Sequence, residues 1–187
     1  VRKANDMVIS MMGKLKVGEL FRKDPSVIHT SSDGQKFYVQ VDSVHASSSF
    51  KYFGKEKGIV TLTFIDDMHR LFHSLTIMAS EREALYVFEG LMQNDVVQSD
   101  MHSTDTHGTN GINFALLYLA KIRFIPRIED FQNQNFYIFH EMEVPKLIDY
   151  DLKIGKSIDT SVIENNWDML CRMMSTILTK QCSATTL

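Results

Sequence analysis

The sequence predicts a mixed α/β domain, and three features of the chain carry that prediction. Two runs rich in β-branched and aromatic residues, Ile59–Ile65 and Leu71–Met78, flank a short and mostly polar segment, as expected for a β-hairpin. A Ser-x-x-Glu capping box at Ser80–Glu83 then opens an amphipathic helix. The remaining strand, helix and strand patterns follow in order at 96–104, 110–121 and 122–125.

Both ends of the chain have helical patterns. Helical spacing predicts a leading helix over 6–20, which Asp24-Pro25 ends, and short strands over 26–33 and 37–41 follow. A second capping box at Ser161–Glu164 opens a long amphipathic helix that has no stop signal before Leu187. The apolar positions of that helix are Trp167, Leu170, Cys171, Met174, Ile177 and Leu178. We therefore expect a leading helical segment (1–25), a core (26–140) and a helical C-terminal part (141–187).

The composition is that of a folded protein without a membrane span. Hydrophobic residues make up 44% of the chain and charged residues 23%, and no run approaches the roughly 18 apolar residues of a membrane helix. On one helix the two cysteines would lie about 16 Å apart, so we expect free thiols and an intracellular setting. The net charge of −3 hides a net of +4 over residues 1–58 and −5 over 59–135. A basic approach to an acidic centre suits a metal site that receives a polyanion, although such imbalances are common.

Two aspartates stand where predicted strands end beside glycine. Asp33 lies in Ser31-Ser32-Asp33-Gly34-Gln35, and Asp105 lies in Thr104-Asp105-Thr106-His107-Gly108. Strand ends are where an α/β sheet presents functional groups, and two carboxylates there share hard divalent cations through oxygen ligands. Two such ions polarise a phosphodiester and stabilise the attacking and leaving oxygens. The alternative is that Asp33 is a turn residue and Asp105 a helix cap.

The sequence motifs around these aspartates resemble those of the catalytic domain of the Tn-three family of replicative transposases. The resemblance runs from about Ser31 to the C-terminal helix, and the Thr-Asp-Thr-His-Gly block is its most distinctive part. The interval of 72 residues between Asp33 and Asp105 suits the first two acids of that family. The blocks, in order, are Ser31–Gln35, Lys51–Gly54, Glu83–Val87 with Glu89–Leu91, Thr104–Gly108 and Phe124–Asp130.

The resemblance implies a ribonuclease H-like mixed sheet with flanking helices, an Asp-Asp-Glu triad, and the start of a helical insertion over 141–187. Asp33 and Asp105 would be the catalytic and metal-binding residues, with magnesium as the cofactor and manganese as a substitute. The family's glutamate lies well past the second aspartate, so we expect it outside these residues. None of the later glutamates stands in the context of the family's third acid, so none is assigned to the triad: Glu129, Glu141, Glu143 and Glu164.

Five residues are candidates for contacting DNA. Lys51, Lys55 and Lys57 form a basic loop with neighbouring aromatic residues, which suits DNA phosphates but also a solvated hairpin tip. His107 is placed to contact a scissile phosphate or to orient Asp105, or simply to cap a turn. Arg127 is a phosphate-contact candidate or the partner of Glu129 or Asp130 in an ion pair.

Three functions compete on this reading. The first is a fragment of a transposase catalytic domain, inactive without its third carboxylate. The intact enzyme would cut transposon ends and join them to target DNA in the bacterial cytoplasm, associated with the nucleoid, as a homo-oligomer and away from membranes. The second is a non-catalytic module that binds DNA or the full-length transposase. The third is a stand-alone metal-dependent nuclease that takes its third carboxylate from within these residues.

Overall fold

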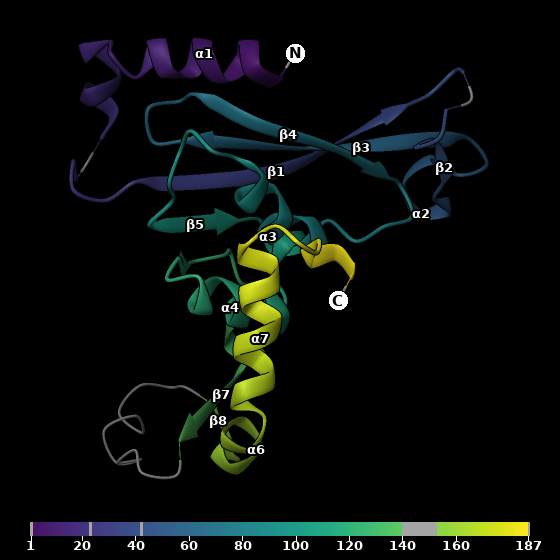
Figure 1. Cartoon of the computed structure of the whole chain (residues 1–187). Helices are drawn as coiled ribbons and strands as arrows, with labels where there is room; N and C mark the ends of the chain where they lie inside the picture. The colour runs from purple at the N-terminus through teal and green to yellow at the C-terminus, as the bar shows by residue number, and fades with distance from the viewer. Residues whose placement is uncertain (1, 23, 42, 140–152, 187) are drawn as a thin grey trace.

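A computed structural model describes residues 2–22, 24–41, 43–139 and 153–186 (Figure 1). The strands are β1 (His29–Tyr38), β2 (Ser47–Ser48), β3 (Lys57–Asp66), β4 (Leu71–Met78), β5 (Met101–Thr104), β6 (Arg123–Phe124), β7 (Asn135–Phe139) and β8 (Lys153–Ile158). The α-helices are α1 (Arg2–Met12), α2 (Phe50–Phe53), α3 (Ala84–Gln93), α4 (Gly111–Leu119), α6 (Thr160–Asn165) and α7 (Trp167–Leu178). Short 3-10 turns lie at Lys16–Phe21, Thr106–Gly108, Phe131–Asn133 and Ala184–Thr186. The predicted α/β class is confirmed.

The main sheet of the described residues is mixed. Its strands run in the order β2-β3-β1-β5-β6, and β4 also pairs with β3. β3 is antiparallel to β1 and β4, whereas β5 is parallel to β1 and β6 is parallel to β5. The predicted hairpin over 59–78 is therefore present as β3 and β4. The first strand consequently lies between an antiparallel and a parallel neighbour.

β1 is longer than the sequence indicated. Separate strands were expected over 26–33 and 37–41, with Asp33 ending the first, but β1 is continuous from His29 to Tyr38. That prediction was wrong because β3 extends beside the whole segment and supplies partners as far as Tyr38↔Gly58. Asp33 consequently lies within the strand, opposite Thr63.

Helix α3 packs on one face of the sheet and forms the core with β3 and β4. Buried members of this core include Leu62, Phe64, Phe72 and Phe88. A Cβ at Gly90 would lie 2.1 Å from the Phe64 ring, so glycine is what lets α3 approach β3 this closely. The predicted capping box at Ser80 and Glu83 does not form, because α3 begins at Ala84 and Glu83 makes no cap hydrogen bond.

The strand expected over 96–104 is reduced to β5, Met101–Thr104. The buried side chain of Asn94 explains the difference. It accepts hydrogen bonds from the backbone N–H groups of Val96 and Val97 and donates one to the Val97 carbonyl. These bonds hold the segment after α3 in a turn, as asparagine commonly does.

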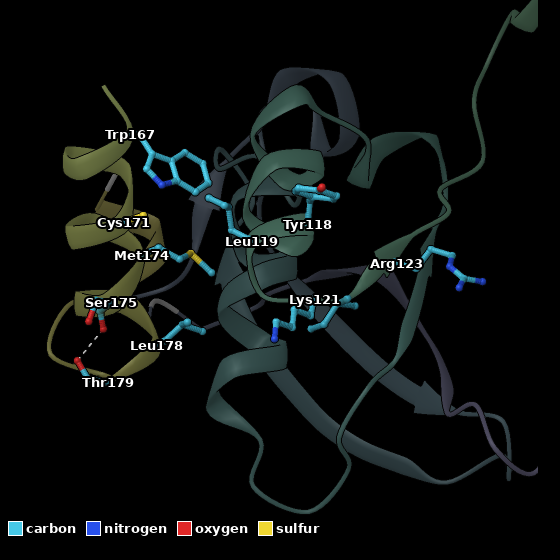
Figure 2. Close-up of a pocket in the computed structure, with 11 residues that line it drawn as sticks. Tyr118, Leu119, Lys121, Arg123, Trp167, Cys171, Met174, Ser175, Leu178 and Thr179 are labelled. Atoms are coloured by element: carbon cyan, nitrogen blue, oxygen red, sulfur yellow. Dashed lines mark hydrogen bonds between the residues drawn. The ribbon is translucent and has the colours of Figure 1, made fainter. Parts of the chain in front are cut away.

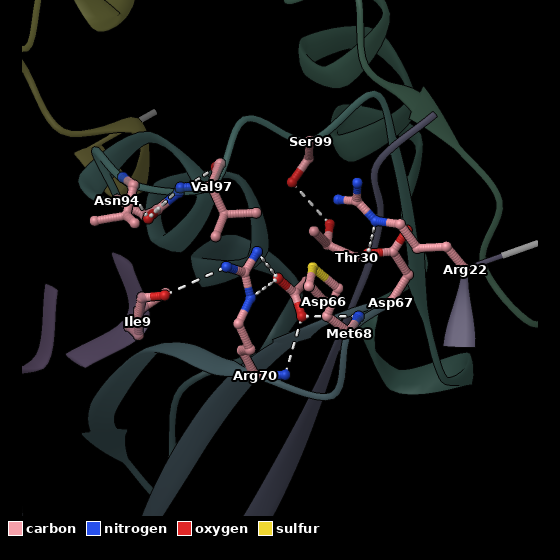
Figure 3. A network of polar contacts seen from close by, with 11 residues as sticks. Ile9, Arg22, Thr30, Asp66, Asp67, Met68, Arg70, Asn94, Val97 and Ser99 are labelled. Carbon is pink, nitrogen blue, oxygen red and sulfur yellow. Dashed lines mark hydrogen bonds and ion pairs between the residues drawn. The ribbon is translucent and has the colours of Figure 1, made fainter. Parts of the chain in front are cut away.

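A buried ion pair ties α1 to the β3–β4 hairpin (Figure 3). Asp66 accepts hydrogen bonds from the Arg70 side chain at 2.7 Å and from the backbone N–H groups of Met68 and Arg70. Arg70 in turn donates to the carbonyl of Ile9 at 3.3 Å. The leading helix was predicted over 6–20. It is instead α1 followed by a separate 3-10 turn, with Gly13 between them.

The C-terminal part differs from the single long helix that was predicted. Asp159 caps α6, α7 is a separate helix, and β8 precedes both and pairs with β7. α7 ends at Leu178, and the chain then returns to α3, where Glu89 accepts hydrogen bonds from Ser183 and from the backbone of Ala184. The expectation that the helix has no end before Leu187 was therefore wrong. The boundary expected at 140/141 lies outside the described residues.

The apolar stripe of α7 is only partly buried. Met174 and Ile177 belong to the core, whereas Trp167 is 50% exposed. Trp167 and Met174 line a groove of about 820 Å³ between α7 and the end of α4 (Figure 2). No described helix is both long and apolar enough to cross a membrane.

Candidate active site

Each of the two candidate aspartates comes directly after the last residue pair that joins strands β1 and β5. β1 and β5 are parallel neighbours, and the last pair of their ladder is Ser32↔Thr104. Asp33 and Asp105 are the next residue on each strand. Because neighbouring strands lie about 4.8 Å apart, the backbones that carry the two carboxylates are adjacent. The strands that hold Asp33 and Asp105 are therefore neighbours in the sheet.

Asp105 is held by the turn that follows β5. Its carboxylate accepts hydrogen bonds from the backbone N–H of His107 at 3.0 Å and of Gly108 at 3.2 Å, and it lies 2.9 Å from the His107 ring Nδ1. The Asp105 side chain thus caps this short turn, as the alternative reading expected. The cap and a metal ligand are compatible roles, because a carboxylate has more lone pairs than these contacts use. The His107 ring makes this contact from an exposed position.

Asp33 is exposed on β1, and its Oδ1 accepts a hydrogen bond from the Gly34 N–H at 2.9 Å. The alternation of burial along β1 gives the reason for its exposure. Thr30 and Ser32 face the core, so Asp33 faces the opposite side of the sheet. No turn holds Asp33, which rules out the turn reading for this residue.

A buried polar cluster joins β1 to β5 directly behind the aspartates. The His102 ring is fully buried, with Nδ1 2.8 Å from the Thr30 hydroxyl and Nε2 3.0 Å from the Ser32 hydroxyl. Burial, and to a smaller extent the charge on His29, lowers the pKa of His102 to about 3, so the ring is neutral. These bonds pin the β1–β5 register on which the spacing of the carboxylates depends.

Sequence reasoning missed an ion pair beside this site. Lys36 Nζ lies 2.8 Å from Glu83 Oε1, and both side chains are largely buried. Burial lowers the pKa of Lys36, but the hydrogen bond and charge of Glu83, together with the charge of Asp105, outweigh that effect and raise it. A Cβ at Gly34 would lie 2.1 Å from Glu83 Oε2, so this glycine makes room for the pair. No pattern in the sequence indicated this pair, because Lys36 falls between the two strands that were expected there.

The other DNA-contact candidates lie at two separate places on the sheet. Lys51 is exposed on α2, Lys55 is exposed in the turn after it, and Lys57 is the exposed first residue of β3. Arg127 is exposed beside β5, where its backbone N–H donates to the Thr104 carbonyl at 2.8 Å. Within the described residues Arg127 makes no ion pair with Glu129 or Asp130, although that was the simpler alternative.

A third acid does not join the pair in the described part of the chain. Over 2–22, 24–41, 43–139 and 153–186, no group of three or more His, Cys, Asp or Glu side chains is placed to hold a metal ion. Glu129 is exposed near the 3-10 turn at Phe131, and Glu164 is exposed on α6. Glu141 and Glu143 lie outside the described residues. The groove beside α7 has no Asp, Glu or His in its lining and is not a carboxylate site.

The fold and the paired aspartates define a class: an α/β domain with two carboxylates at adjacent strand positions, as expected of a DDE domain. Comparison with known proteins agrees. The family model described as the Tn3 transposase DDE domain matches residues 1–187. The chain belongs to this family.

The curated relatives are transposases of bacterial transposons. The chain is 29% identical over 144 residues to the transposase for transposon gamma-delta of Escherichia coli, covering 76% of this chain and 14% of that protein. It is 30% identical to the transposase for Tn1546 of Enterococcus faecium, covering 79% of this chain and 15% of that protein. It is 32% identical to the transposase for Tn4556 of Streptomyces fradiae, covering 80% and 17%. The chain thus spans about a sixth of the length of these relatives, and no solved structure matches it.

Proposed function

We propose that this chain is the part of a transposase catalytic domain that supplies the first two carboxylates of the triad, Asp33 and Asp105. The adjacency of β1 and β5 carries the proposal, because it brings together two acids that lie 72 residues apart in the sequence. The mixed sheet order β4-β3-β1-β5-β6 is consistent with a ribonuclease H-like core.

The carboxylate chemistry of Asp33 and Asp105 supports a divalent cation of the magnesium type as the cofactor. Magnesium takes oxygen ligands in octahedral geometry and is commonly bound through one or two carboxylates, with water and substrate phosphates completing its shell. When bound, such ions supply charge stabilisation to the attacking and leaving oxygens of a phosphodiester. Asp33 and Asp105 would hold them. His107 fixes the orientation of the Asp105 carboxylate through a 2.9 Å contact, as outer residues do around metal ligands.

The DNA substrate would approach across the basic residues. Lys51, Lys55, Lys57 and Arg127 are exposed and offer contacts for DNA phosphates. In the intact enzyme, water would cleave a transposon end to release a 3′-hydroxyl, which would then attack target DNA. The oligomeric enzyme would act on DNA in the cytoplasm at the nucleoid. This activity and this location are what membership of the family implies for the intact protein.

A metal titration tests the assignment of the aspartates. The chain should bind manganese weakly, because two carboxylates are few protein ligands, and paramagnetic relaxation of water should report the binding. Asp33→Ala and Asp105→Ala should each abolish it. Asp168→Ala, which removes an exposed carboxylate on α7, is the matched control and should leave it unchanged. Binding that survives both site substitutions would place the ions elsewhere.

A nicking assay separates the proposed fragment from a stand-alone nuclease. We expect no nicking of supercoiled plasmid in manganese, because the described residues place no third acid beside the pair. Losing one preorganised electrostatic group typically costs about 10²–10³ in rate, and a poorly held ion costs more. Metal-dependent nicking well above an Asp33→Ala, Asp105→Ala double variant would favour the nuclease. Inhibition of a full-length transposase by the inactive chain would favour an interaction module.

A further inference from the structure

A pocket of about 350 Å³ lies beside the turn that carries Asp105. Its lining includes two groups of interest, the basic side chains of Lys36, Lys51 and Arg82, and the ring of Tyr52. His107 belongs to the same lining and contacts the Asp105 carboxylate at 2.9 Å, so the pocket adjoins the candidate active site. Its volume falls within the range of small-ligand sites.

The Tyr52 ring is held against the protein, and the ammonium groups of Lys36 and Lys51 lie over it. It is half-buried and packs against a small core cluster that contains Phe53, Val60 and Ile77. Lys36 Nζ lies 4.5 Å from the ring centroid, and the Glu83 carboxylate holds that lysine in place. The ring is therefore a preorganised aromatic surface rather than a mobile side chain, and ordering it on binding costs little.

Two cations at the pocket are free of ion pairs within the described residues. Lys51 Nζ lies 5.0 Å from the Tyr52 centroid and makes only this contact, and the exposed Arg82 side chain makes no ion pair. Lys36, in contrast, is neutralised by Glu83. A fixed aromatic ring with free cations beside it is suited to a planar π-system that carries an anion, because bases stack on aromatic side chains while phosphates pair with lysine or arginine.

We propose that this pocket holds one unpaired nucleotide of DNA, with its base stacked on Tyr52 and its phosphate contacted by Lys51 and Arg82. A base within a duplex is covered by its neighbours on both sides, so only an unpaired or extruded base offers a face to the ring. The contact of His107 with both the pocket and Asp105 places that nucleotide next to the phosphodiester held at the carboxylates. The assignment rests on the proposed function and adds a substrate subsite to it.

Binding of labelled DNA to the 187-residue chain tests the pocket by fluorescence anisotropy in magnesium-free buffer. Three DNAs of equal duplex length are compared: a blunt end, an end with one unpaired nucleotide, and the same end with an abasic sugar in place of that nucleotide. Stacking of one base on an aromatic ring is worth about a five- to hundredfold difference in affinity. We expect the unpaired nucleotide to bind tighter than the abasic end by this factor.

Substitutions of Tyr52 test whether its ring causes the preference for the unpaired base. Tyr52→Leu keeps apolar packing against the core cluster and should remove the preference for the base, whereas Tyr52→Phe keeps the ring and should retain it. Tyr137→Leu removes an exposed tyrosine of β7 and is the matched control. A preference that persists in Tyr52→Leu, or that is absent from the unsubstituted chain, overturns the proposal. Thermal unfolding of each variant shows whether it is folded, and an unfolded Tyr52→Leu is replaced by Lys51→Ala, which should lower affinity for both unpaired ends.

Two further experiments distinguish this proposal from a site for free nucleotides and from the proposed metal centre. Free deoxynucleoside monophosphate should compete only at far higher concentration than the DNA end, and equal potency would overturn the DNA assignment in favour of a free-nucleotide site. Asp33→Ala and Asp105→Ala should leave the base preference intact. If the manganese titration fails while the base preference holds, the proposed metal centre is wrong and the nucleotide pocket stands. If the reverse occurs, the pocket alone is wrong.

Discussion

The buried His102 makes the stability of this protein depend on pH in a way that is measurable. The ring is fully buried, and both of its nitrogens contact hydroxyl groups of β1. Burial lowers its pKa to about 3 in the folded chain, whereas an exposed histidine of the unfolded chain has a pKa of about 6.5. Between these values the unfolded chain binds one more proton than the folded chain, so acidification favours unfolding.

The magnitude follows from this single proton. One extra proton in the unfolded state lowers the free energy of unfolding by about 1.4 kcal/mol for each pH unit. The stability that depends on a neutral His102 should therefore be fully present well above pH 6.5, and the free energy of unfolding should fall by about 2 kcal/mol between pH 6.5 and pH 4.5. His102→Gln retains hydrogen-bonding groups but does not titrate, so its stability should fall less over the same range.

Urea unfolding of both chains at pH 7.5, 6.5, 5.5 and 4.5 is the assay. The difference between the two free energies of unfolding isolates His102, because the carboxylates titrate in both chains. His45→Gln, at an exposed position, is the control and should follow the unsubstituted chain. Parallel curves for the unsubstituted chain and His102→Gln between pH 6.5 and 4.5 would refute the argument that His102 is buried and neutral.

Three other predictions concern packing and charge. Asp66→Asn should lower the free energy of unfolding by about 3 kcal/mol, measured by urea titration, because it leaves the Arg70 charge buried without its partner; a loss below about 1 kcal/mol would contradict the buried pair. Gly90→Ala should cost about 2 kcal/mol despite its better helix propensity, because its Cβ meets the Phe64 ring, whereas Gly111→Ala, with open space around it, should cost nothing in the same titration. Glu83→Gln removes the negative charge beside Lys36 and should lower the pKa of Lys36, as followed by NMR of its ammonium group. An unchanged pKa would show that Glu83 does not raise it.

Local patterns were enough to predict several parts of this molecule. Alternating β-branched and aromatic residues predicted the β3–β4 hairpin, because burial of one sheet face requires that period. The sequence motifs around Asp33 and Asp105 predicted membership of the transposase family, which the family model confirms over the whole chain. The residues proposed as metal ligands stay a prediction.

Other features depended on contacts between distant segments. Pattern alone could not show that β1 runs past Gly34, because the partner that extends it is β3, about thirty residues further on. The Ser80–Glu83 motif looked like a helix cap, but Glu83 instead pairs with Lys36, since Gly34 leaves room for its carboxylate.

The sequence by itself determined which residues could form strands, helices and an acidic site, because those choices rest on periodicity and on side-chain chemistry. Only the tertiary structure decided which of them meet. The parallel pairing of β1 with β5, pinned by His102 between Thr30 and Ser32, sets Asp33 beside Asp105. A pairing between strands some seventy residues apart leaves no local trace in the sequence, because its free energy comes from burial and hydrogen bonds that form only when the chain has folded.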